Sequence, residues 1–192
     1  MLLFALSTFL AAFLLFQVEL VIGKAILPWY GGTPAVWTTC LLFFQVALLG
    51  GYSWSHALMV RTAPRRQSLA HGILLLGCLA VLGWHLAVWG SPLLPGASWK
   101  PAGQESPVPA ILSVLAASVG LPFFALSATA PLLQAWFSRV WPGRSPYRLY
   151  ALSNLGSLLA LLSYPFLVEP LFSLRAQARV WGLGFAVFAL AF

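Results

Sequence analysis

The sequence predicts an all-α fold: a polytopic transmembrane bundle of about six helices that forms a single domain over residues 1–192. Hydrophobic residues make up 61% of the chain, charged residues only 7%, and the mean hydropathy is +0.92. A soluble domain carries about 25% charged residues and could not bury this much apolar surface, so lipid must be the solvent. Apolar runs of about twenty residues recur between short loops, which is typical of membrane-spanning helices.

The first two helices are expected at about residues 2–26 and 35–60. A signal peptide would have a basic start and a shorter apolar core, so we interpret the first run as a retained span. Between the two spans lies LPWYGGTPAVW, in which Pro28 and Pro34 remove backbone donors and a Gly pair supplies a turn. We expect this segment to break the helix, and its aromatic rings to lie where hydrocarbon meets water.

The other four helices are expected at about residues 67–90, 110–137, 147–168 and 174–192. Residues 91–109, rich in Pro, Gly and Ser, are expected to form the longest and most irregular loop. The fifth helix is expected to end at Glu169 and Pro170. It carries a small-residue face suited to close helix contact, made of Ser153, Gly156, Ser157 and Ala160.

The fourth helix contains two prolines, Pro122 and Pro131. Each leaves the carbonyl four residues earlier, at Ser118 and Ser127, without its helical donor. The hydroxyls of these two serines can partly satisfy the freed carbonyls. We therefore expect a kink near one of the prolines.

Basic residues set the expected orientation. With the N-terminus in the cytoplasm, the two compact loops at residues 61–66 and 138–146 place their arginines inside, as the positive-inside rule favours. Six basic residues then lie inside, and four outside: Lys24, Lys100, Arg175 and Arg179. We expect a multi-pass protein of the inner (cytoplasmic) membrane with its N-terminus in the cytoplasm.

Charged residues near the outer membrane level form the candidate ligand-binding or ionic cluster. Arg175 and Arg179 share a helix face at a helix N-terminus, where the macrodipole disfavours cations, and on the side where positive charge is disfavoured. Two carboxylates are candidates to compensate them: Glu169, close along the chain, and Glu19, across the bundle. With Lys24, these residues would hold the first helix against the fifth and sixth. The alternative is that both arginines reach headgroup phosphates.

Uncharged polar residues within the spans are candidates for helix packing: Gln45, Ser153, Asn154 and Ser157. A polar substrate contact at Asn154 stays open as an alternative. His56, His71 and His85 invite a haem or metal interpretation, but lone histidines without nearby Cys or acid favour packing roles. Cys40 and Cys78 are interpreted as small buried residues. We expect no metal and no cofactor.

Three segments carry a family resemblance: GKAILPWYGGTPAVWTTCLLFFQVALLGGYSWSH, LPFFALSATAPLLQAWFSR and PYRLYALSNLGSLLALLSYPFLVEP. They resemble the membrane region of bacterial fused major-facilitator/spermidine-synthase-like proteins, over nearly the whole chain. The resemblance implies half of a major-facilitator-like transporter, or a membrane anchor preceding a cytosolic synthase-like domain. The chain departs from the family pattern at Leu20, where a Pro is usual, and its loop at residues 61–66 lacks the acid of the transporter motif.

Catalysis by this chain alone is not expected, because aminopropyl transfer needs a glycine-rich loop and acidic residues. No GxGxxG occurs, Asp is absent, and the acids are the scattered Glu19, Glu105 and Glu169. One hypothesis is a transporter-like half or anchor that handles a small cationic solute. The other is a non-catalytic subunit packed against a larger membrane complex. The expected partners are the lipid bilayer, other membrane subunits or a second copy, and no nucleic acid, since the net charge of +7 resides in short loops.

Topology is testable with two single cysteines. Ser98→Cys should react with an impermeant thiol reagent added outside the cell, and Thr62→Cys should not, because the arginines beside Thr62 retain that loop in the cytoplasm. Labelling of intact cells, then of opened cells, measures this. Reaction of Thr62→Cys from outside would mean that the orientation is inverted.

Overall fold

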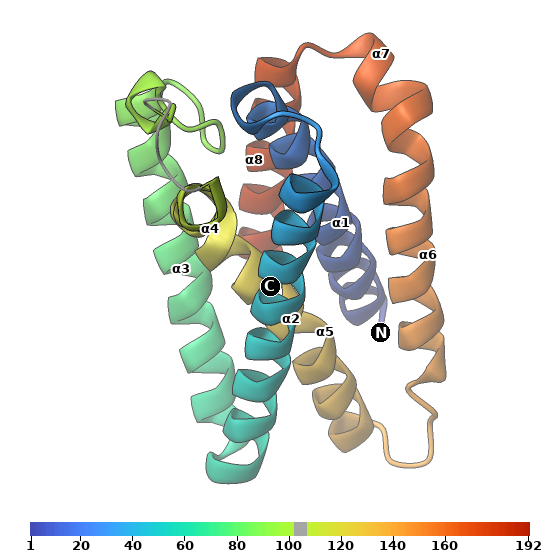
Figure 1. Cartoon of the computed structure of the whole chain (residues 1–192). Helices are drawn as coiled ribbons and strands as arrows, with labels where there is room; N and C mark the ends of the chain where they lie inside the picture. Colours follow the sequence, from blue (N-terminus) through green and yellow to red (C-terminus); the bar gives the residue numbers. More distant parts are fainter. Residues whose placement is uncertain (102–106) are drawn as a thin grey trace.

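The computed structural model describes residues 1–101 and 107–192, and every regular element in those ranges is helical (Figure 1). The all-helical fold class is therefore confirmed. The elements are α1 (Leu2–Tyr30), α2 (Pro34–Arg61), α3 (Pro64–Trp89), the 3₁₀ turn η1 (Ala97–Trp99), α4 (Pro107–Leu115), the π segment η2 (Ala116–Gly120), α5 (Leu121–Val140), α6 (Tyr147–Ser163), the π segment η3 (Tyr164–Val168), α7 (Glu169–Leu171) and α8 (Leu174–Ala191).

Five helices in the described part of the chain are long and apolar enough to cross a membrane. They are α1, α2, α3, the continuous run Pro107–Val140 and the continuous run Tyr147–Leu171. The sixth helix, α8, is shorter and carries Arg175, Gln177 and Arg179 in its first two turns. Its end lies near mid-height of the bundle (Figure 1). The described residues thus form a helical bundle of about six helices, as predicted, and five of these helices are candidate membrane spans.

Helix α1 lies at the centre of the bundle and packs against α5, α6 and α8. Its most apolar stretch is 56% buried inside the protein, whereas that of α6 is only 17% buried. Several side chains bond across its contacts, and two of these bonds are short. Trp181 Nε1 of α8 donates to the Leu14 carbonyl at 2.8 Å, and Gln17 Nε2 of α1 donates to the Ala160 carbonyl of α6 at 2.8 Å.

The close contact between α1 and α6 depends on the small-residue face expected from the sequence. Gly156 and Ala160 of α6 are buried there. A Cβ atom added at Gly156 would lie 2.6 Å from the Phe9 carbonyl oxygen, so only glycine allows this approach. Gly51 has the same role in the contact between α2 and α5, where a Cβ would lie 2.9 Å from the Phe124 carbonyl oxygen.

The segment between the first two spans breaks the helix as expected, but the first helix ends four residues later than predicted. Helix α1 continues through Pro28 to Tyr30 and ends at Gly31, whose φ of 81° suits glycine. Pro28 lies in the last turn, where its missing N–H costs a single ladder bond, and the Gly31 N–H still bonds the Leu27 carbonyl at 2.8 Å. Pro34 begins α2 at a position where a helix has no use for the N–H, so the loop shrinks to residues 31–33.

The fourth predicted helix is interrupted close to Pro122. The π segment η2 ends two residues before this proline, and the helix axis changes direction there: Figure 1 shows α4 nearly end-on and α5 from the side. Helix α5 continues through Pro131. The predicted serine compensation is wrong. The buried Ser118 hydroxyl has no partner among the described residues, and the Ser127 hydroxyl bonds the Phe124 carbonyl instead.

Replacement of Gly156 by Ala should destabilise the bundle, because the new Cβ collides with the α1 backbone. We expect a loss of about 1–3 kcal/mol in the free energy of unfolding in detergent. Gly77→Ala on α3 is the matched control, since a Cβ there meets nothing within 4 Å. Equal stabilities of the two variants would contradict the close packing of α1 and α6.

Candidate functional site

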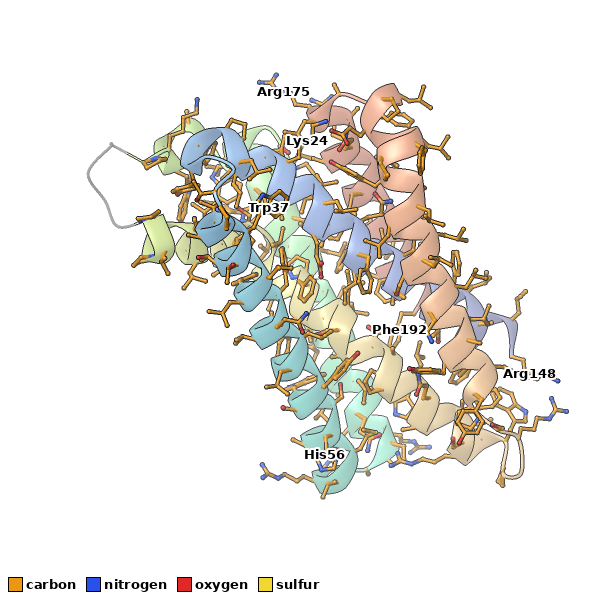
Figure 2. All side chains as sticks on the ribbon, turned by 45° about the vertical axis from the view of Figure 1, so that its right-hand side comes forward. Lys24, Trp37, His56, Arg148, Arg175 and Phe192 are labelled. Carbon is orange, nitrogen blue, oxygen red and sulfur yellow. The ribbon has the colours of Figure 1, made fainter. Side chains whose placement is uncertain are left out.

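Charged residues gather at both ends of the bundle (Figure 2). Lys24 and Arg175 lie at one end, which we call the Lys24 end. His56 and Arg148 lie at the opposite end, which we call the His56 end. This distribution fits the two arginine loops lying on one side of a membrane, and the side itself stays a prediction.

The predicted cluster of Glu19, Lys24, Glu169, Arg175 and Arg179 reduces to one ion pair among the described residues. Lys24 Nζ lies 2.7 Å from Glu169 Oε1, with side chains 39% and 45% exposed, and this pair connects α1 to α7. Glu19 is half-buried on α1 and makes no ion pair with any described residue.

The two arginines fail to join the cluster because of the rotation of α8. This helix turns Gln177, Ala178 and Trp181 inward, so Arg175 and Arg179, one turn apart, both lie on its exposed face. The pairing of Glu19 with Arg179 across the bundle is therefore absent.

A buried amide takes the place of this pairing. The Tyr164 hydroxyl donates to Gln177 Oε1 at 3.1 Å, and Gln177 Nε2 donates to the Phe172 carbonyl at 2.8 Å. These bonds hold α8 against the end of α6 and α7. Gln177 and Gln17 were not predicted from the sequence, although a lone amide within an apolar run is itself a signal of interhelical bonding.

The histidines have separate surroundings. The fully buried His71 lies with Nε2 3.0 Å from Thr129 Oγ1, and His85 Nδ1 lies 3.2 Å from the Pro92 carbonyl while its ring stacks on Trp89. His56 is exposed on α2. Within residues 1–101 and 107–192 no three His, Cys, Asp or Glu side chains group as metal ligands would.

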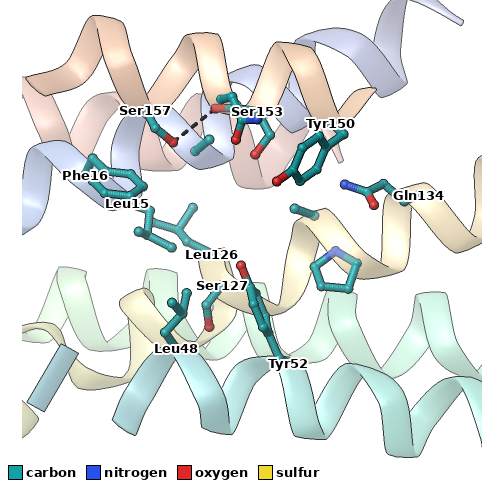
Figure 3. Close-up of a pocket in the computed structure, with 14 residues that line it drawn as sticks. Leu15, Phe16, Leu48, Tyr52, Leu126, Ser127, Gln134, Tyr150, Ser153 and Ser157 are labelled. Atoms are coloured by element: carbon teal, nitrogen blue, oxygen red, sulfur yellow. Dashed lines mark hydrogen bonds between the residues drawn. The ribbon is translucent and has the colours of Figure 1, made fainter. Parts of the chain in front are cut away.

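A cavity of about 430 Å³ lies within the bundle and has several polar side chains in its lining (Figure 3). It lies between α1, α2, α5 and α6. Its polar lining is Tyr52, Ser127, Gln134, Tyr150, Ser153, Asn154 and Ser157, and the described residues around it include no charged side chain. We call it the polar pocket.

Three of the four residues predicted for helix packing line the polar pocket instead of bonding to a neighbouring helix. Ser153 and Asn154 make no side-chain bond to another helix, and the Ser157 hydroxyl bonds the Ser153 carbonyl of its own helix at 3.1 Å (Figure 3). The α1 contact uses Gly156 and Ala160 instead, which turns the serines toward the cavity. Gln45 is exposed on α2 and lies outside the pocket, so its packing role stays a prediction.

Five polar groups in the polar pocket have no side-chain hydrogen bond to any described residue: the phenols of Tyr52 and Tyr150, the amides of Gln134 and Asn154, and the hydroxyl of Ser153. Figure 3 shows both phenol oxygens pointing into the space between α2 and α6. At 1.5 Å per residue, Tyr150 lies about 5 Å and Ser157 about 15 Å from the start of α6. The pocket thus extends from near the His56 end toward mid-membrane, where an unpaired polar group requires water or a ligand.

The ion pair can be tested with a double-mutant cycle. Lys24→Gln and Glu169→Gln should couple by about 0.5–1 kcal/mol in unfolding free energy, as partly exposed pairs do. Glu19→Gln and Arg179→Gln should be additive within about 0.3–0.5 kcal/mol, because these side chains do not meet. Stronger coupling in the second cycle would mean that the rotation of α8 is wrong.

Comparison of the chain with protein-family models, with curated proteins and with solved structures finds no match. The resemblance to the spermidine-synthase-like fused proteins therefore stays a prediction. The cavities of the bundle are the features that bear on function.

Proposed function

We propose that this membrane protein binds a small polar solute in the polar pocket, as one half of a transporter. The five unpaired polar side chains carry this proposal. A purely structural bundle would pair or remove such groups, because each one costs free energy in hydrocarbon. The cavity volume of 430 Å³ lies within the range of small-molecule sites.

The lining indicates the chemistry of the solute. Phenols and amides can both donate and accept hydrogen bonds, and the serine hydroxyls add further acceptors. The described lining has no carboxylate to neutralise a polyamine. A neutral hydroxylated or amide-bearing molecule fits best, and a small organic cation would rely on the rings of Phe16, Tyr52 and Tyr150.

A second candidate is a non-catalytic subunit of a larger membrane complex. The observation that favours it is the exposure of Asn154 and Gln45 on α6 and α2, within spans that face away from the protein's own core. A partner helix carrying polar side chains would satisfy both amides. In this case the polar pocket would be covered by protein rather than filled by solute.

Cysteine accessibility separates the two functions. In a Cys40→Ala/Cys78→Ala background, Ser153→Cys should react with an impermeant methanethiosulfonate in membrane vesicles, because the polar pocket holds water. Leu155→Cys is the control: it lies at nearly the same depth, is exposed on α6 and does not line the pocket. Equal, slow reaction at both positions would exclude an aqueous pocket and favour the subunit.

A ligand screen by thermal shift then identifies the solute class. A panel of neutral polyols, amides, organic cations and polyamines is added to the purified protein, and a binder should raise the unfolding midpoint. The shift should vanish in Asn154→Leu and persist in Gln45→Leu, which removes an exposed amide outside the pocket. Shifts that survive Asn154→Leu would place the binding elsewhere.

A further inference from the structure

A second cavity, of about 490 Å³, lies between α3 and α8, away from the polar pocket. Its lining is apolar except for one arginine: Leu79, Leu82, Gly83, Leu86, Pro92, Arg179, Gly182, Leu183 and Ala186. Gly83 leaves it open, because a Cβ there would meet nothing within 4 Å. Gly182 instead allows Pro92 to pack closely on α8, since a Cβ there would lie 2.9 Å from the Pro92 Cγ. We call this cavity the α3–α8 slot.

The charge in the α3–α8 slot lies at one end. Arg179 is the fifth residue after the start of α8, about 8 Å below the Lys24 end of that helix. The apolar lining continues deeper, to Ala186 on α8 and to Leu79 on the antiparallel α3, about 10 Å further along each axis. Polarity thus falls from the membrane surface toward the hydrocarbon, as it does along a lipid.

Arg179 has no partner among the described residues. Its side chain is exposed, and it makes no ion pair or hydrogen bond with residues 1–101 or 107–192. Glu169 is occupied by Lys24, and Glu19 lies on α1, which contacts the opposite face of α8 through Trp181. Glu105 lies outside the described residues. A cation at this depth is costly without an anion.

We infer that the α3–α8 slot seats an anionic phospholipid. One acyl chain fills the apolar part between Gly83 and Leu183, and the phosphate accepts charge-assisted hydrogen bonds from the Arg179 guanidinium. Arg175, one turn nearer the surface on the same exposed face, adds a second cation at headgroup level. The two arginines, which the positive-inside rule disfavours at this end, are thereby explained by an anion that the membrane itself supplies.

Native mass spectrometry of the full chain tests this site. Protein purified in mild detergent is supplied with phosphatidylglycerol or with zwitterionic phosphatidylethanolamine. Wild type should retain phosphatidylglycerol preferentially. Arg179→Gln should weaken retention about tenfold, as loss of a charged hydrogen bond predicts. Gly83→Leu, which fills the slot without touching the charge, should weaken it comparably, and Arg61→Gln at the His56 end should change nothing.

Two control compounds test whether the site binds the whole phospholipid or only its phosphate group. Inorganic phosphate and glycerol 3-phosphate, which lack acyl chains, should not compete with phosphatidylglycerol. If these two anions competed with phosphatidylglycerol, and if Gly83→Leu retained the lipid as wild type does, the site would be only a surface anion contact. This result would overturn the proposed lipid site. Equal retention of both lipids by wild type, or full retention by Arg179→Gln, would also overturn it. None of these results depends on Ser153 or Asn154. The lipid site and the polar pocket are therefore tested independently.

Discussion

The burial of α1 is the constraint on which the rest of the bundle depends. Lipid tails are as apolar as leucine, so helices in a membrane associate through close packing and hydrogen bonds rather than through a hydrophobic driving force. Helix α1 supplies both. Its backbone packs so closely on Gly156 of α6 that no larger residue fits there. Its Leu14 carbonyl accepts a hydrogen bond from Trp181 of α8, and its Gln17 amide donates one to α6. Helices α2 and α3 contact α5, which in turn packs on α1.

Two of the cavities that this arrangement leaves differ in their chemistry. The polar pocket lies where α2 and α6 diverge over α1 and α5, and its described lining includes polar but no charged side chains. The α3–α8 slot is apolar with a single cation. They use different outer helices, and they approach opposite ends of the bundle. A solute that reaches the first through water and a lipid that reaches the second through the bilayer would therefore not compete for the same entrance.

The sequence predicted the fold class and most helix ends, because runs of apolar residues and breaks at Pro, Gly and Arg are local signals. The rotation of each helix about its own axis was not predictable. Helices α1, α2, α3 and α6 are apolar on most faces, so the hydrophobic pattern does not say which face turns inward. The ionic cluster failed because α8 carries polar residues on more than one face and turns Gln177 inward and Arg179 outward. The contact of α6 with α1 was predictable, since glycine and alanine mark close approach. Of the polar pocket, only the separate residues on α6 were predicted. The other polar lining residues come from α2 and α5, and the sequence does not show that these helices meet α6 there.

The π segments have a consequence for how the chain tolerates change. A π turn contains one more residue than an α turn, so η2 shifts the angular phase of α5 against α4 by about the 100° that one residue spans. The inward direction of Ser127 and Gln134 is therefore set by residue count upstream as well as by residue type. Deleting one residue within Ala116–Gly120 would restore a regular helix and swing both side chains away from the cavity while leaving every remaining amino acid unchanged. In this segment, the number of residues determines which side chains of α5 face the cavity.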